Sequence, residues 1–294
     1  MKKVCFLFIA LTMIIASSIG CDNKEETVYT VGESMGHIQQ VEFILDTPLP
    51  DSRESVTSYK LVCPEVTIES VESLGASLGF TGEANDVPSE GVIAMSSDGG
   101  ENTLRVSYTG SILYYSKHGL FKLDADLTSY EDTAIIATDF LEEIGLWFPD
   151  VELEEVKVGG TVNTNPSHLL VQYRQYIDGI PLTGNGTSYA VRIGSGGQVV
   201  KVAVWHIELE PQETVQCIEP AEACDSLMAG EGMLFALPFN CSEVTIDNAY
   251  IGYFIEPGME SGDDIIPVYV FEGECLDSDG NYIQDFRTYI EAAK

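Results

Sequence analysis

Apolar residues spaced three and four positions apart predict α-helices in three places along the chain. The first helix carries Val71, Leu74 and Leu78, with Thr67 as its N-cap and Gly79 as its stop. The second helix opens with the Thr-x-x-Glu spacing of a capping box at Thr128 and Glu131, and it ends at Gly145. The stretches Leu78-Gly79-Phe80 and Ile144-Gly145-Leu146 align, so the second helix restates the first.

A third helix is expected to open at Pro220 and to stop near Gly230, with Cys224, Leu227 and Met228 on its inner face. Alternating or β-branched runs predict strands between and after the helices. The glycine-rich run 194–197 and the Asp-Gly pair at 279–280 predict tight hairpin turns. The predicted strands are 40–45, 60–62, 91–95, 103–108, 112–115, 169–176, 188–193, 199–207, 244–255, 266–271 and 282–289.

One helix followed by a meander of strands recurs with a period of roughly 80 residues, which is too long for a solenoid. A helix lying on one face of an antiparallel sheet buries such a pattern. The fold expected is therefore α+β, with repeated cystatin-like units, each a helix packed on an antiparallel meander sheet. The expected organisation is a signal peptide, a tether, an N-terminal α+β unit, a central unit and a C-terminal unit, at 1–20, 21–27, 28–125, 126–210 and 211–294.

The first twenty residues have the layout of an export signal. Lys2 and Lys3 precede a run of about a dozen apolar residues, which is too short to cross a bilayer core of roughly 30 Å. Ser18, Ile19, Gly20 and Cys21 then resemble the lipobox of a prokaryotic lipoprotein precursor. We expect cleavage before Cys21, lipid attachment to that residue and an extracytoplasmic location at the cell membrane. The alternative is an ordinary secretory signal cut elsewhere.

The composition is strongly acidic, with 47 acidic against 14 basic residues and a net charge of −33. Because 45% of the residues are hydrophobic, this charge belongs to folded surfaces rather than to a disordered chain. Such a surface repels nucleic acid, and no cluster of Lys and Arg reverses the field locally. The acid could serve solubility in high salt, cation uptake or a basic partner, and composition does not choose among these three.

Five cysteines remain once Cys5 is removed with the signal and Cys21 is lipidated. In an oxidising compartment, the four near the C-terminus could close two disulfides in any of three connectivities, which would leave Cys63 as the odd thiol. Simple buried thiols are the alternative. These cysteines have neither C-x-x-C spacing nor a neighbouring His, so the sequence does not favour a zinc site. The four candidate disulfide cysteines are Cys217, Cys224, Cys241 and Cys275.

The segment Tyr173-Arg174-Gln175-Tyr176-Ile177-Asp178-Gly179-Ile180-Pro181-Leu182 resembles the signature of PepSY and FTP domains. That signature is a strand ending in Gln, an aromatic residue, an Asp-Gly turn and an apolar-Pro-apolar step into the next strand. The tail is similar to a closing PepSY unit, with Glu256-Pro257, then 267–273 and a turn at 279–281. The likeness covers 128–293, and more weakly 59–115.

PepSY and FTP domains occur in the propeptides of thermolysin-like metalloproteases. The resemblance implies a cystatin-like body that covers or chaperones a protease, and related folds occur among regulators of sensor histidine kinases. No catalytic domain follows in this sequence, so inhibition would act in trans.

Other motifs favour ordinary structure over catalysis. Gly32-Glu33-Ser34-Met35-Gly36 matches the G-x-S-x-G elbow of hydrolases, but the strand, turn and helix that this elbow needs are missing around it. The acidic run at 277–285 is a hairpin turn rather than an EF-hand, because its glycine comes one step early. Asn185 and Asn240 begin glycosylation sequons. His37, His118, His168 and His206 lack paired spacing for a metal.

The sequence therefore predicts no catalytic, cofactor or metal site. We expect a non-enzymatic, membrane-anchored envelope lipoprotein that binds a protein or peptide partner and regulates or inhibits a protease in trans. The alternatives are an acidic structural surface module without a specific ligand and a regulator of an extracytoplasmic sensor-kinase system.

Overall fold

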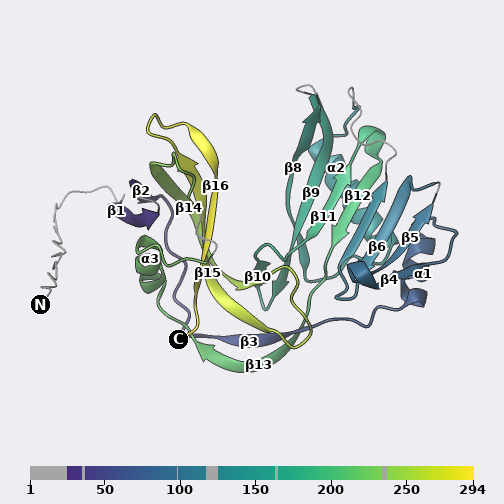
Figure 1. Cartoon of the computed structure of the whole chain (residues 1–294), viewed down its shortest axis with the longest axis horizontal. Coiled ribbons are helices and arrows are strands. Elements are labelled where there is room, and N and C mark those ends of the chain that lie inside the picture. The colour runs from purple at the N-terminus through teal and green to yellow at the C-terminus, as the bar shows by residue number, and fades with distance from the viewer. Residues whose placement is uncertain (1–24, 35–36, 98, 117–124, 163–164, 234–236) are drawn as a thin grey trace, which may run out of the picture.

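The structure is a computed structural model that describes residues 25–34, 37–97, 99–116, 125–162, 165–233 and 237–294 (Figure 1). Within these residues, sixteen strands form one hydrogen-bonded network with three α-helices. Figure 1 shows two lobes that rise on either side of a gap, with β3 and β13 running below them. We call them the two-helix lobe, which contains α1 and α2, and the terminal lobe, which contains α3 and both ends of the described chain.

The three helices form where the hydrophobic spacing predicts them. Each of the three helices is followed, directly after its last turn, by a glycine with positive φ. Phe80 N donates to Gly75 O at 2.9 Å beyond the first helix, and Leu146 N donates to Leu141 O at 2.8 Å beyond the second. The predicted restatement of the first helix end by the second is therefore confirmed. The helices are α1 (Ile68–Ser77), α2 (Tyr130–Glu143) and α3 (Pro220–Met228), and two short 3₁₀ turns are η1 (Pro88–Glu90) and η2 (Ser195–Gly197).

The helix starts follow local chemistry, with one correction. Thr67 caps α1 as predicted, because its side chain accepts from Ser70 N, and Pro220 occupies the first turn of α3. The capping box predicted at Thr128 is wrong by one residue. Ser129 is the N-cap of α2, and its hydroxyl accepts from Asp132 N at 3.1 Å.

The two-helix lobe is built on a single antiparallel sheet whose strands are paired throughout. α1 and α2 cover the same face of this sheet, since Tyr114 packs against the cores beneath both helices. Val71 of α1 and Leu141 of α2 are fully buried there. In spatial order the strands are β8 (Val151–Val162), β9 (Asn165–Ile177), β11 (Tyr189–Ile193), β12 (Val199–Val204), β7 (Ile112–Ser116), β6 (Asn102–Ser107), β5 (Val92–Ser97) and β4 (Asn85–Val87).

The terminal lobe combines strands from the two ends of the chain in a mixed sheet. β1 pairs antiparallel with β2, β2 lies parallel to β14, and β15 pairs antiparallel with both β14 and β16. α3 covers this sheet through Ala223 and Leu227, which belong to the same core as Phe271 and Phe286. The strands are β1 (Glu25–Ser34), β2 (His37–Leu45), β14 (Glu243–Phe254), β15 (Asp264–Leu276) and β16 (Tyr282–Glu291).

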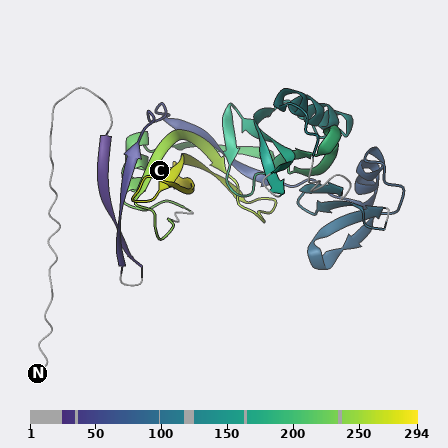
Figure 2. The same cartoon turned by 90° about the horizontal axis from the view of Figure 1, so that it is seen from above.

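Three further strands join the lobes: β3 (Ser55–Val62), β10 (Ile180–Thr183) and β13 (Glu208–Gln216). β10 pairs with β9 of one lobe and with β14 of the other, while β3 pairs with β13 and β15. The Asp178-Gly179 turn before β10 is confirmed, because both residues have positive φ, as a two-residue hairpin turn requires. In Figure 2 the β1–β2 hairpin and α1 lie at opposite ends of the molecule.

The prediction of repeated cystatin-like units, each a helix on its own meander, is wrong. β7 pairs with β12, so the first two helices share one sheet across the predicted boundary at 125/126. β2 pairs with β14, so residues assigned to the N-terminal unit complete the C-terminal sheet. In separate units, these edge strands would have unpaired backbone N–H and C=O groups. Pairing the edge strands with each other supplies those hydrogen bonds, which favours one large mixed sheet.

Strand positions agree better than strand pairing. Each of the eleven predicted strands overlaps an observed one, and the hairpin turns at 194–197 and 279–280 connect the strands that they were predicted to connect. The last three residues of the predicted strand 199–207 lie beyond β12, which ends at Val204. The pattern missed β4, β8, β10 and β13, although the PepSY-like segment implies a strand at β10, and β1 begins at Glu25, inside the predicted tether.

Candidate functional site

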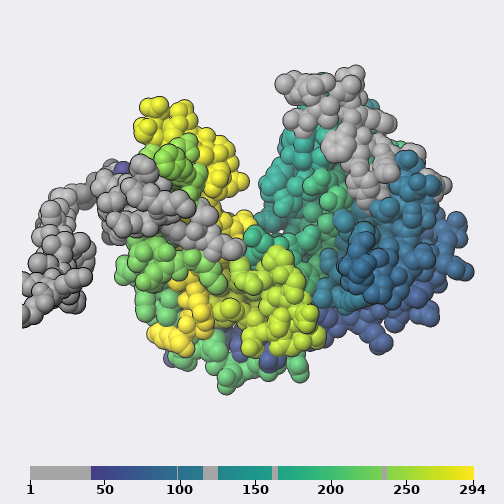
Figure 3. Space-filling view, viewed as in Figure 1, coloured from purple at the N-terminus to yellow at the C-terminus, as the bar shows by residue number. Residues whose placement is uncertain are grey.

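A cleft of about 710 Å³ separates the two lobes. Figure 3 shows it as a hollow between the teal surface of the two-helix lobe and the yellow surface of the terminal lobe. β8 and β9 line one wall and β15 and β16 line the other, while the loop from Thr183 to Ser188 contributes to the lining as well. Residues from both lobes therefore meet in one concave site.

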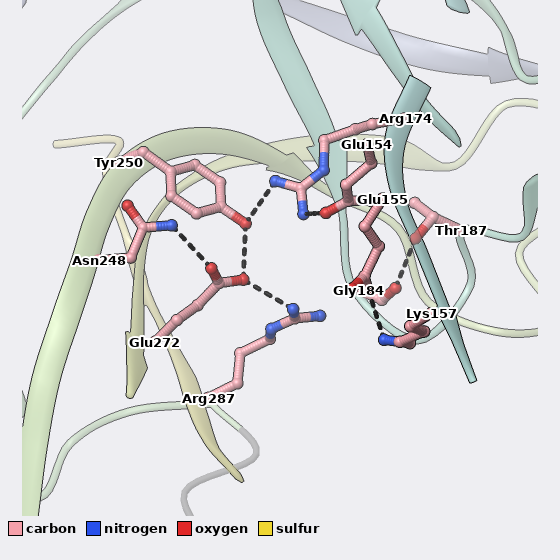
Figure 4. A network of polar contacts seen from close by, with 10 residues as sticks. All are labelled: Glu154, Glu155, Lys157, Arg174, Gly184, Thr187, Asn248, Tyr250, Glu272 and Arg287. Atoms are coloured by element: carbon pink, nitrogen blue, oxygen red, sulfur yellow. Dashed lines mark hydrogen bonds and ion pairs between the residues drawn. The ribbon is translucent and has the colours of Figure 1, made fainter. Parts of the chain in front are cut away.

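A polar network crosses the cleft and is centred on Arg174 (Figure 4). Arg174 lies on β9, where it forms an ion pair with Glu154 of the neighbouring strand β8. Its second guanidinium nitrogen, Nη1, donates to the Tyr250 hydroxyl on β14 at 3.0 Å, and the guanidinium also lies 5.4 Å from the centre of the Tyr250 ring. Arg174 thus connects the two lobes by an ion pair, a charge-assisted hydrogen bond and a cation–π contact.

Glu272 continues the network on the terminal lobe. It accepts a hydrogen bond from the Tyr250 hydroxyl at 2.9 Å and one from Asn248 Nδ2 at 2.9 Å. Arg287 of β16 forms an ion pair with it at 2.7 Å. The Glu272 side chain is 17% exposed, so these three partners offset the cost of removing a carboxylate from water.

Burial and neighbouring charge fix the protonation of this network. Burial raises the pKa of Tyr250 to about 12, and Glu272 adds to the effect. Burial alone would lower the pKa of Arg174, but Tyr250 and Glu154 raise it above its usual range. At neutral pH the Tyr250 hydroxyl is therefore a neutral donor and Arg174 is a cation.

The cleft has more acid than its basic groups neutralise. Six carboxylates and three basic side chains line it, and each basic group is already ion-paired: Lys157 with Glu155, Arg174 with Glu154, and Arg287 with Glu272. Within the described part of the chain, the other three lining carboxylates form no ion pair. These three, which we call the acidic patch, are Asp247, Glu274 and Asp285.

Two members of the acidic patch are cross-strand neighbours. Glu274 on β15 lies directly opposite Asp285 on β16, and both are exposed. Like charges at directly opposite positions destabilise a sheet. A hydrogen bond from the Tyr282 hydroxyl to Asp285, at 2.8 Å, relieves part of this repulsion. The remaining electrostatic cost falls when a cation lies over the pair.

Gln175 supports the cleft wall from behind. Its amide nitrogen donates to Ile207 O at 2.8 Å and to Asp150 at 2.9 Å, and its carbonyl oxygen accepts from Ile207 N at 3.0 Å. His206 also contacts Asp150, at 3.1 Å, and stacks on Phe148. The Gln of the PepSY-like segment therefore acts here as a structural bridge from β9 to the chain beyond β12.

The predicted modification sites lie in different places. Cys21 is outside the described residues, as is His118. Asn185 is exposed in the loop that lines the cleft, whereas Asn240 is exposed between α3 and β14. Ser34 lies at the end of a strand, which differs from the strand-to-helix elbow of a hydrolase.

Two residues considered as metal ligands from the sequence, Asp277 and His168, lie in a turn and in the protein core. Asp277 accepts from the backbone N–H groups of Asp279 and Asn281, as a turn residue does. Among the described residues, no group of three or more His, Cys, Asp or Glu side chains is arranged to hold a metal ion. His168 is buried beside Ser167 on β9. No helix of the described ranges combines the length and apolar content that a transmembrane helix needs.

Sequence reasoning missed the cleft because its lining residues come from seven strands. One local signal was present: Gln172 and Arg174 alternate with the buried residues Val171, Tyr173 and Gln175 on β9. Such alternation marks a strand with one polar face. It does not indicate which strands lie opposite that face.

No protein-family model matches the chain, and no curated protein matches it. Among solved structures, the chain is similar to an uncharacterized protein from Eubacterium rectale. The TM-score is 0.49 at 12% sequence identity, and the match covers 86% of each chain. The resemblance to PepSY and FTP domains accordingly stays a prediction from the residues that carry it.

Proposed function

We propose that this protein is a non-enzymatic, lipid-anchored extracytoplasmic protein whose cleft binds a basic segment of a protein partner. The observation that carries the proposal is the acidic patch, in which Glu274 and Asp285 lie opposite each other and, within the described ranges, neither forms an ion pair. A Lys or Arg side chain placed there replaces repulsion by attraction. Electrostatic complementarity of this kind selects partners and speeds their association.

The size and the lining of the cleft support a peptide segment as the ligand. Its volume of about 710 Å³ lies within the range of small-molecule and peptide sites. Polar and charged side chains predominate in the lining, with Tyr173, Tyr189, Trp205 and Phe286 as the aromatic members. These four aromatic residues are buried, so the surface offered to a ligand is mainly polar and charged, which favours a basic segment over an apolar one.

The cation groups of the cleft are committed to the protein itself, which supports binding rather than catalysis. Arg174 and Arg287 hold Glu154 and Glu272 in fixed positions. This arrangement stiffens the two walls before a partner arrives, which lowers the entropy cost of association. Lipidation at Cys21 would hold the cleft at the membrane surface, where it meets exported or membrane-bound proteins.

A charge-matched pair of variants tests the proposal. The cleft variant carries Asp247→Asn, Glu274→Gln and Asp285→Asn. The control carries Asp139→Asn, Glu142→Gln and Glu143→Gln, which remove three exposed charges from α2. The probe is an arginine-containing decapeptide labelled for fluorescence anisotropy. We expect the cleft variant to bind it at least tenfold more weakly, and the control to change affinity less than twofold.

The same variants address the partner in the cell membrane. Crosslinking from the wild-type protein should recover a partner that the cleft variant loses and the control retains. Equal weakening in both variants would show that affinity follows net charge alone, as expected for an acidic structural module. That result, or the absence of peptide binding by the wild-type protein, contradicts the proposal.

A further inference from the structure

Two of the five described cysteines lie together in the core of the terminal lobe. Cys275 is on β15 and has no exposed surface, and Cys241, which is 2% exposed, lies two residues before β14 begins. Both belong to the hydrophobic core that α3 covers. The Cys241 thiol donates to Glu243 O at 3.3 Å, and the Cys241 and Cys275 thiols lie close enough for each to affect the pKa of the other.

Backbone pairing fixes this approach. Val244 lies opposite Cys275 in the antiparallel register of β14 and β15. Just before this pair, Ser242 N donates to Leu276 O at 2.9 Å, and Cys241 N donates to Pro238 O at 3.0 Å. The turn that ends at Cys241 is thereby folded back toward β15, and the two side chains enter the same core.

Two other cysteines have different surroundings. Cys217 follows β13, where its backbone N–H donates to Glu54 O at 3.0 Å; burial raises the pKa of its thiol, and the charges of Arg53 and Lys294 offset part of this rise. Cys63 follows β3, on the strand pair below the lobes, and the carboxylates of Asp263 and Glu260 influence its thiol. The proximity of Cys241 and Cys275 thus argues against the two connectivities that would pair either residue with Cys217 or Cys224.

We infer that Cys241 and Cys275 form a disulfide when the protein folds in an oxidising compartment, while Cys63, Cys217 and Cys224 remain thiols. The oxidant is a disulfide, either small or carried by a thiol oxidoreductase. One cysteine thiolate attacks the oxidant, forms a mixed disulfide and releases the first thiol of the oxidant. The second cysteine thiolate then attacks the sulfur of the first, closes the Cys241–Cys275 bond and releases the second thiol. The oxidant is reduced to two thiols, which take up the two protons.

Burial determines when the reaction occurs. Desolvation raises the pKa of Cys275 to about 12, and the neighbouring Cys241 thiol adds to this effect. Since the thiolate is the nucleophile, the folded reduced protein reacts slowly. The bond is therefore expected to form during folding, before α3 covers the pair.

The test is refolding of the full mature chain, from the reduced denatured state, in a buffer of reduced and oxidised glutathione. Free thiols are then alkylated under denaturing conditions, and the digest is analysed by mass spectrometry without reduction. We expect one crosslinked peptide pair that contains Cys241 and Cys275, with Cys63, Cys217 and Cys224 alkylated.

Two single variants serve as matched controls. Cys241→Ser should abolish the crosslink and leave Cys275 alkylated, whereas Cys217→Ser should retain it. Because each variant removes one buried thiol, the Cys217→Ser protein also shows whether loss of a thiol alone prevents folding. Alkylation of both Cys241 and Cys275 in the refolded wild-type protein, or a crosslink of either to another cysteine, overturns the inference.

Discussion

Replacing Arg174 with Met tests whether the network across the cleft holds the two lobes together. Met keeps most of the aliphatic stem but removes the guanidinium. Three interactions are lost: the ion pair with Glu154, the hydrogen bond to Tyr250 and the cation–π contact with its ring. The substitution also leaves Glu154 without its basic partner.

The magnitude follows from the exposure of these groups. A hydrogen bond from a charged donor contributes about 1.5–3 kcal/mol, and a cation–π contact contributes about 0.5–1 kcal/mol. The Arg174 and Glu154 side chains are 18% and 32% exposed, so solvent screens their ion pair to about 0.5 kcal/mol. These three contributions are not fully additive, because one guanidinium makes all three interactions. We therefore expect Arg174→Met to lower the free energy of unfolding by about 2.5 kcal/mol.

The assay is equilibrium unfolding in guanidinium chloride, with Lys157→Met as the control. Lys157 pairs with Glu155 in the same cleft, but these side chains are 49% and 42% exposed, so the control should change stability by less than about 0.5 kcal/mol. Combining Arg174→Met with Tyr250→Phe should reveal a coupling energy of about 1–1.5 kcal/mol. An Arg174→Met effect no larger than the control, or a coupling within about 0.3 kcal/mol of zero, would refute the reasoning.

Three further predictions follow from the packing. Gln175→Leu should cost about 2–4 kcal/mol of unfolding free energy, because it leaves the buried N–H and C=O of Ile207 unpaired; unchanged denaturant midpoints would contradict this. Gly273→Ala should prevent normal pairing of β14 with β15, since a Cβ there would lie 1.9 Å from Thr245 O, and a wild-type melting temperature would count against it. Tyr250 and three other tyrosines have pKa values raised by burial to about 12. Above pH 10 the folded chain keeps protons that the unfolded chain loses, so stability should fall as pH rises from 10 through 12; a free energy of unfolding that stays constant from pH 10 to pH 12 would disprove this.

The helices could be predicted because their signals are local. Thr67 and Pro220 begin helices through chemistry within one turn, and Gly79 and Gly145 end them in the same way. Even here the choice between adjacent hydroxyl residues failed, since Ser129 rather than its neighbour caps α2. Which residue caps a helix depends on where the backbone becomes helical, and the sequence does not fix that position to within one residue.

Sheet order could not be predicted, because it depends on contacts between distant segments. β8 was missed because Glu152, Glu154, Glu155 and Lys157 give it low β-propensity, although such charges suit the edge of a sheet. The apolar and aromatic run in β7 indicates a strand but not its partner β12, nearly ninety residues away along the chain. The cleft could not be predicted without the sheet order, since its walls exist only when these strands are correctly arranged.

The pairing of β2 with β14 has a consequence for biogenesis. A chain that is exported from its N-terminus delivers β2 to the far side of the membrane about two hundred residues before β14 emerges. Until then β2 lacks the neighbour that completes its sheet, and the wall of the cleft that carries Glu274 has not been made. In an exported chain, the proposed binding cleft would therefore be complete only after the last strand has been translocated. A truncation that ends before β14 should consequently leave one edge of the β1–β2 hairpin unpaired, and such a chain should be more sensitive to proteolysis than the full-length protein.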